Sequence, residues 1–215
     1  MERDVLEKLE KKEITADELY KQVEKDFDLI SEICRGISSS KAHVRYPCAK
    51  VLNLLSGEKP EKLYPEMDFF ITLLDSDKRI LLWNALIIVA NLTRIDEERK
   101  FDNIFDKYFS FIDDEYMVTV ANVVGNAGKI AKAKPYLNER ITRELLRVEN
   151  LLLKPHLTQE CRNILLGHAI SAFETYFDQM ENKEEVISFV KRQLNNSRDG
   201  TRKKAQKFLE KFNLQ

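Results

Sequence analysis

The chain has 215 residues, of which 43% are hydrophobic and 33% are charged, and its formal net charge is −1. This composition supplies enough apolar side chains for a buried core, and the charge balance does not demand a nucleic acid or a membrane as partner. Only six glycines and five prolines are present. That scarcity disfavours a many-stranded β protein and favours long helices joined by short connections.

The two ends of the chain carry opposite charge. Residues 1–32 contain eleven acidic and six basic side chains, whereas residues 191–215 contain eight basic and two acidic ones. One interpretation is that both ends are solvated caps, because the terminal units of a repeat protein need polar outer faces. The other is a basic docking site for an acidic partner or a phosphate backbone. Its residues would be Arg198, Arg202, Lys203, Lys204 and Lys207.

The beginning of the chain predicts a helix over residues 2–12, inside an N-terminal capping segment 1–14. Thr15 and Glu18 follow with the spacing of a capping box, in which each side chain bonds the other residue's free backbone N–H. From Leu19 to Ile37 apolar residues recur at steps of three and four. This pattern predicts one continuous helix with a single buried face.

The same pattern continues along the chain and predicts helices over residues 41–55, 60–75, 78–94, 98–112, 115–132, 136–153, 158–180, 183–194 and 199–212. Short turns rich in Ser, Asp or Asn separate them. Asn182 and Glu185 have the spacing of a second capping box. No segment shows the strict alternation typical of a strand, so the sequence predicts an all-α fold.

An alanine returns at nearly fixed intervals. Ala49, Ala85 and Ala121 are 36 residues apart, Ala169 follows after 48 and Ala205 after another 36. Each lies in the second helix of a predicted hairpin, where a small side chain lets stacked helices approach closely. Such a period is typical of stacked repeat proteins. The sequence therefore predicts one α-solenoid domain over 1–215, with an enlarged fourth unit and hairpins at about 15–56, 60–94, 98–132, 136–180 and 183–213.

Three segments carry a resemblance to a known class of repeats. Residues 44–52, VRYPCAKVL, resemble the V-R-x-x-A-x-x-x-L pattern that opens the second helix of a HEAT repeat, and residues 75–80, DSDKRI, are similar to the acidic turn before that helix. Residues 201–205, TRKKA, match it more weakly, and Leu81 and Met117 stand where an arginine is usual.

The resemblance to HEAT/armadillo α-solenoids covers roughly residues 27–213. It implies a right-handed superhelix of about five helical hairpins after an N-terminal helix. It also implies that the second helices line a concave face, which in this class is usually a protein-binding surface.

No sequence motif for catalysis or for a cofactor is present. The chain has no Gly-rich phosphate loop, no H-E-x-x-H, no C-x-x-C and no nucleophile elbow. His43, His156 and His168 lie far apart in sequence, so neither a metal nor another cofactor is expected. Three cysteines on apolar helices, Cys34, Cys48 and Cys161, are expected to be buried and reduced in a cytoplasmic protein. No membrane segment or signal peptide is expected.

Four asparagines are candidates for partner contacts. Asn84 and Asn91 share one face of a second helix, and Asn122 and Asn126 lie on the equivalent helix of the next unit. In armadillo proteins similar asparagines hold the backbone of an extended peptide, because an amide offers both a donor and an acceptor. The alternative is that these amides bridge neighbouring units of the protein itself. Trp83 could be a binding platform or a core residue.

The sequence thus favours a non-catalytic scaffold that binds a segment of another protein on its concave face. One alternative is nucleic-acid binding by the basic C-terminal hairpin. A less favoured alternative is a DNA glycosylase or lyase of the HEAT-like class, which would need aromatic and acidic residues in a basic concave channel.

Overall fold

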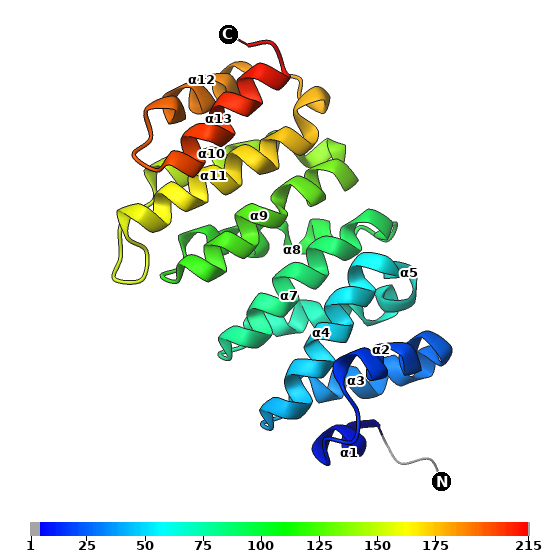
Figure 1. Ribbon diagram of the computed structural model, residues 1–215. Helices are drawn as coiled ribbons and strands as arrows, with labels where there is room; N and C mark the ends of the chain where they lie inside the picture. The colour runs from blue at the N-terminus through cyan, green and yellow to red at the C-terminus, as the bar shows by residue number, and fades with distance from the viewer. Residues whose placement is uncertain (1–4, 215) are drawn as a thin grey trace. The chain divides into compact units, whose positions relative to one another are not determined.

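The computed structural model describes residues 5–214, and in this range the chain is all-α (Figure 1). The β-type pairing found there is an isolated antiparallel bridge between Lys154 and Leu157. The prediction of an all-α fold is therefore confirmed. By their internal contacts the residues form two compact units, Met1–Asp96 and Glu97–Gln215, and the boundary lies between the second and third predicted hairpins.

The first unit alternates short first helices with longer second helices. Its helices are α1 (Val5–Glu10), α2 (Ala16–Lys25), α3 (Ile30–Gly36), α4 (Ala42–Glu58), α5 (Pro60–Leu63), α6 (Met67–Thr72) and α7 (Arg79–Leu92). Turns of 3-10 helix at Phe27–Leu29, Tyr64–Glu66, Leu73–Asp75 and Thr93–Ile95 extend or join them. The second helices α4 and α7 pack directly on each other.

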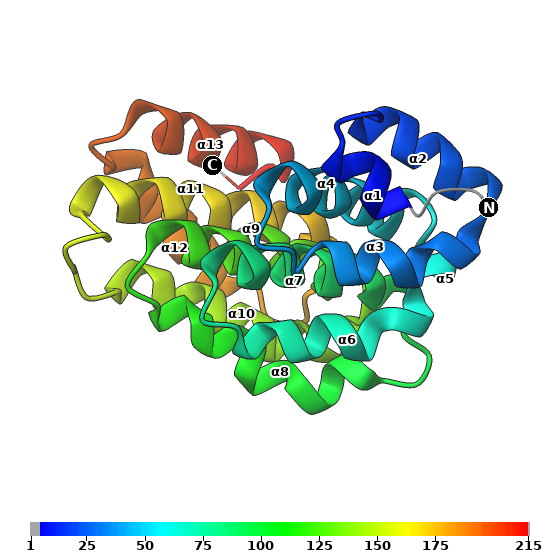
Figure 2. The same cartoon turned by 90° about the horizontal axis from the view of Figure 1, so that it is seen from below.

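The second unit repeats this arrangement. It contains α8 (Lys100–Ser110), α9 (Met117–Ala133), α10 (Asn138–Leu146), α11 (Gln159–Tyr176), α12 (Glu184–Arg192) and α13 (Asp199–Lys211). Its 3-10 turns are Phe111–Asp113, Pro135–Leu137, Arg147–Asn150, Phe177–Gln179 and Gln193–Asn195. The second helices α9, α11 and α13 lie side by side, with α11 in the middle (Figures 1 and 2).

Of the two capping boxes predicted from the sequence, one is formed. The Thr15–Glu18 capping box is formed: Thr15 Oγ1 accepts from the Glu18 backbone N–H at 3.3 Å, and Glu18 Oε2 accepts from the Thr15 backbone N–H at 2.8 Å. The second predicted box is wrong. Asn182 Oδ1 accepts from the backbone N–H of Glu184 at 3.2 Å instead, because α12 begins one residue later than expected.

Two predicted helices are interrupted. The helix expected from Leu19 to Ile37 stops at Lys25, because Asp26 adopts an extended backbone and its Oδ1 accepts from the Asp28 N–H at 3.1 Å. A side chain that bonds the local backbone in this way competes with the helix. The helix expected over 60–75 changes to a 3-10 turn at Pro65, which has no N–H to continue the α-helical bonds.

The recurring alanines mark the close-packed second helices at four of their five positions. Ala49, Ala85, Ala169 and Ala205 are buried, whereas Ala121 is half-buried. In α9 a close approach to α11 occurs at Gly128, since a Cβ built there would lie 2.8 Å from the Ala172 carbonyl oxygen. The enlarged fourth repeat provides the loop after Asn150, and its His156 ring stacks on Tyr116 with centroids 4.7 Å apart.

Candidate partner-binding surfaces

In the first unit the side-chain amides bridge the two second helices. Asn84 on α7 accepts from Asn53 Nδ2 on α4 and donates to the Ile80 carbonyl at 2.6 Å. Asn91 donates from Nδ2 to Ser56 Oγ at 2.9 Å. These bonds fix the register of α7 against α4. Asn84 is only 8% exposed, so its amide is used mainly inside the protein, whereas Asn91 is half-buried.

Apolar side chains face solvent on the same two helices. On α4, Tyr46 is 54% exposed and Leu54 is 36% exposed, and they flank Lys50 at steps of four residues. On α7, Trp83 and Ile87 are half-buried, also four residues apart. Residues four apart share one face of a helix. We call Tyr46, Lys50, Leu54, Trp83, Ile87 and Asn91 the unit 1 strip.

Sequence reasoning identified Trp83 and Asn91 in this strip but missed Tyr46 and Leu54. The available signal was their helical phase, because Val44, Cys48 and Val51 occupy the opposite, buried face of α4. Residues 48–55 are largely apolar, so the sequence there does not separate the exposed face of the helix from the buried one. The strip presents apolar surface edged by one amide and one lysine, which is the mixture typical of protein interfaces.

In the second unit Asn122 and Asn126 lie on α9. Asn126 is 7% exposed and donates from Nδ2 to the Asn122 carbonyl at 2.8 Å, within its own helix. The Asn122 side chain is half-buried and makes no hydrogen bond with the described residues. Val118, one turn before it, is an exposed apolar side chain. Asn122 is therefore the more accessible of the two amides.

The predicted basic patch lies at the start of α13 and along its length. Arg198 forms an ion pair with Glu160 on α11. Asp199 accepts ion pairs from Arg202 at 3.2 Å and from Lys203 at 2.8 Å. Three of the five cations are thus paired with two acids of their own unit, Glu160 and Asp199, which lowers the positive potential that the sequence alone implies.

The remaining two cations of the patch differ from each other. Lys204 donates from Nζ to the Gly167 carbonyl at 3.0 Å, and burial lowers its pKa. Lys207 is exposed on the same helix. His168 is on α11 and close enough to Lys204 of α13 to be affected by its charge. Burial is the larger cause that lowers the pKa of His168, and the charge of Lys204 is the smaller one. The centre of α11 therefore favours a neutral imidazole.

The cysteines follow the expectation in part. Cys34 and Cys48 are buried without a disulfide, and burial raises the pKa of the Cys48 thiol to about 12 and that of Cys34 further. Cys161 differs, because it is half-exposed at the first turn of α11. Among residues 5–214 no group of three or more His, Cys, Asp or Glu side chains could hold a metal ion. Nor, over this same stretch, is any helix long and apolar enough to cross a bilayer.

Comparison with solved structures agrees with the fold. A designed armadillo repeat protein, YIII(Dq)4CqI, superposes with a TM-score of 0.61 at 14% sequence identity, covering 90% of this chain and 85% of that one. A second engineered protein gives a TM-score of 0.53 at 14% identity, covering 90% of this chain and 84% of that one. No protein-family model matches the sequence. No curated protein matches it either.

The helices, their stacking and these structural neighbours define the class of protein. The chain is an all-α helical-repeat protein with an armadillo/HEAT-like fold. At 14% identity the neighbours are evidence for the fold, and any function must be argued from the surfaces of this chain.

Proposed function

We propose that this protein is a non-catalytic scaffold that binds an extended segment of a partner protein along its second helices. The observation that carries the proposal is the unit 1 strip, in which Tyr46 and Leu54 are exposed on α4 and Trp83 is half-buried on α7, the helix that packs against it. Contiguous apolar side chains on the surface are typical of interaction sites. A tryptophan or tyrosine in such a site is a frequent source of binding energy.

The asparagines contribute unequally to this proposal. Asn91 and Asn122 retain exposed surface and are proposed as polar contacts for the backbone of the partner. Asn84 and Asn126 are more than nine-tenths buried and bond to neighbouring groups of the protein. Contact of these two amides with a partner stays a prediction. Their main contribution is to hold α7 and α9 in shape beneath the surface.

We place this function in the cytoplasm, because the buried Cys34 and Cys48 thiols are unpaired, as is usual in a reducing compartment. The nucleic-acid alternative has less support. It would use the basic patch, in which Arg198, Arg202 and Lys203 are already paired with local acids.

The proposal is tested by capture of partners from native lysate with the wild-type chain and two matched variants. Leu54→Lys places a charge in the unit 1 strip, whereas Leu194→Lys changes another exposed leucine outside it. Both changes are on the surface, so circular dichroism should show unchanged folding. We expect the captured proteins to be lost with Leu54→Lys and retained with Leu194→Lys. Equal capture by both variants would show that the strip is not the binding surface.

A further inference from the structure

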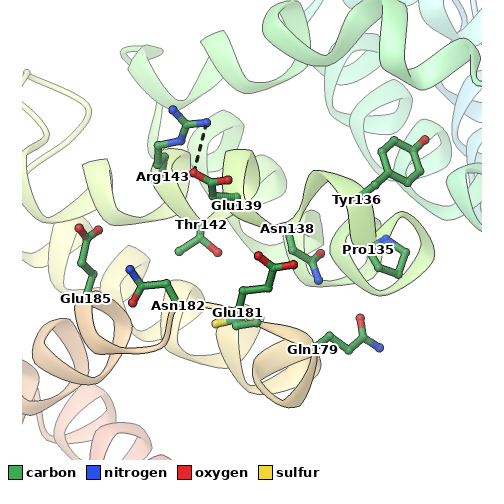
Figure 3. A pocket seen from close by; sticks show the side chains of 11 residues that line it. Pro135, Tyr136, Asn138, Glu139, Thr142, Arg143, Gln179, Glu181, Asn182 and Glu185 are labelled. Carbon is green, nitrogen blue, oxygen red and sulfur yellow. Dashed lines mark ion pairs between the residues drawn. The ribbon is translucent and has the colours of Figure 1, made fainter.

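A cavity of about 310 Å³ lies in the second unit, away from the second-helix surfaces (Figure 3). Its walls come from the start of α10 and from the connection between α11 and α12. The residues that line it are Pro135, Tyr136, Asn138, Glu139, Thr142, Arg143, Gln179, Met180, Glu181, Asn182 and Glu185. This volume is at the lower end of the range for small-molecule sites.

Asn138 is the unusual member of the lining. It is 6% exposed, and neither its Nδ2 nor its Oδ1 has a hydrogen-bond partner. Asn138 is the first residue of α10, after a proline-initiated 3-10 turn, and its amide is directed toward the space that Glu181 enters from the other wall (Figure 3). Buried polar side chains are nearly always hydrogen-bonded, so an unpaired amide in a cavity wall points to a ligand that pairs with it.

The charge of the lining selects the kind of ligand. The lining contains three glutamates and one arginine, and the only ion pair among them, between Arg143 and Glu139 one turn apart on α10, is long at 4.0 Å. Glu181 and Glu185 form no ion pair with any described residue. The cavity therefore has excess negative charge, which attracts an organic cation.

We propose that this cavity binds a primary ammonium or guanidinium group on a short alkyl chain. The cation lies against Glu181 and Glu185, a polar group of the ligand pairs with the Asn138 amide, and the alkyl chain contacts Met180. Two sources present this chemistry: a free amine such as agmatine or putrescine, and the side chain of a lysine or arginine in a partner. The site is separate from the unit 1 strip, so its test does not depend on the proposed function.

Isothermal titration calorimetry tests the proposal on the full chain with agmatine and putrescine, and with 1,4-butanediol as a neutral ligand of similar length. A second series uses N-acetyl-lysine amide in place of the free amines. We expect binding of one cation per chain, weakened by salt, and no binding of the diol. Binding of the amines assigns a free ligand, whereas binding of the lysine derivative alone assigns a partner side chain. Failure of every cation to bind, or equal binding of the diol, would overturn the proposal.

Three variants assign the binding to this cavity. Glu181→Gln should weaken binding about fivefold, since it removes one exposed charge partner, and its matched control Glu184→Gln changes a neighbouring exposed acid outside the lining. Asn138→Leu should weaken binding about tenfold.

Because Asn138→Leu could also perturb folding, the wild-type chain provides an independent measurement. The ¹⁵N-resolved side-chain amide signal of Asn138 should shift when agmatine is added. Unchanged affinity in Glu181→Gln, or an unshifted Asn138 amide signal at saturation, would contradict the assignment.

Discussion

Asn91 on α7 donates a side-chain hydrogen bond to Ser56 on α4, with Nδ2 and Oγ 2.9 Å apart. Ser56 is fully buried and donates in turn to the Asn53 carbonyl at 2.7 Å. Asn53 contacts Asn84 nearer the start of α7, so amides and one hydroxyl connect the two helices at two levels. Polar residues in second helices therefore hold the repeats in register, whether or not a partner is bound.

The first prediction concerns this bridge. Asn84→Ala removes two partly buried hydrogen bonds and should lower the free energy of unfolding by about 1–3 kcal/mol. Asn122→Ala is the matched control, because the same residue type on α9 makes no side-chain hydrogen bond within residues 5–214 and should change stability by less than about 0.5 kcal/mol. Urea unfolding followed by circular dichroism measures both. Equal losses in the two variants would argue against a structural role for Asn84.

The second prediction concerns close approach of helices in the second unit. Gly128→Ala places a methyl group against Thr175 Oγ1 and 2.8 Å from the Ala172 carbonyl oxygen, so it should destabilise by about 1–3 kcal/mol. Gly57→Ala on α4 meets nothing within 4 Å and should stabilise by about 0.5 kcal/mol through helix propensity. Thermal melts compare the two. A higher melting temperature for Gly128→Ala would show that α9 and α11 are less tightly packed.

The third prediction concerns pH. Burial and the charge of Lys204 lower the pKa of His168 below its ordinary value of 6.5. In the pH interval between the two values the unfolded state binds more protons than the folded state, so stability falls as the pH drops below about 6.5. His168→Gln should lose less stability than the wild-type chain between pH 7.5 and pH 5.5, about one unit on either side of that ordinary pKa. Unfolding in urea at these two pH values checks this, with exposed His43→Gln as the control.

The fourth prediction concerns the basic patch. Because Arg198, Arg202 and Lys203 are paired with acids, we expect weak binding to duplex DNA. The logarithm of the affinity should fall with the logarithm of salt concentration with a slope no steeper than about −2, equivalent to two phosphate contacts. Fluorescence anisotropy of a labelled duplex at several salt concentrations measures this slope. A slope near −5 would favour nucleic-acid binding over the scaffold function.

The fifth prediction concerns the thiols. Cys161 is half-exposed, whereas Cys34 and Cys48 are buried and the pKa of each of these two thiols is raised by burial. A thiol-reactive chromophore should therefore label one cysteine quickly and the other two only on unfolding. Mass spectrometry of the labelled peptides identifies the site. Rapid labelling of Cys34 or Cys48 in the native chain would mean that the first unit opens readily.

Features that depend only on residues close in sequence could be predicted. Features in which a side chain competes with the helix for backbone hydrogen bonds could not. The Thr15–Glu18 capping box formed because both partners lie within one helical turn. The expected continuous helix through Asp26 failed because its carboxylate bonds the local backbone instead. Apolar periodicity is the same on both sides of Asp26, so it gave no warning of the break.

In the candidate surfaces, too, some residues could be predicted from the sequence and others could not. The sequence points to Asn91 because Asn126 has a nearly equivalent position in the next unit, and to Trp83 because it is the single tryptophan and lies beside Asn84, but it does not point to Tyr46 or Leu54. The sequence gives no signal for Asn138 and Glu181, since they are 43 residues apart and neither belongs to a recognisable motif. Only folding brings the start of α10 against the connection before α12.

The sequence by itself determined that this is an all-α repeat protein, because helix periodicity and the recurring alanine are properties of residues close together in the chain. Tertiary structure alone decided which polar groups are bonded. Asn84 and Asn91 have partners across the α4–α7 seam, while Asn138 has none in its cavity. The physical reason is that a hydrogen bond between helices depends on distance and orientation, which are set by how the whole unit packs.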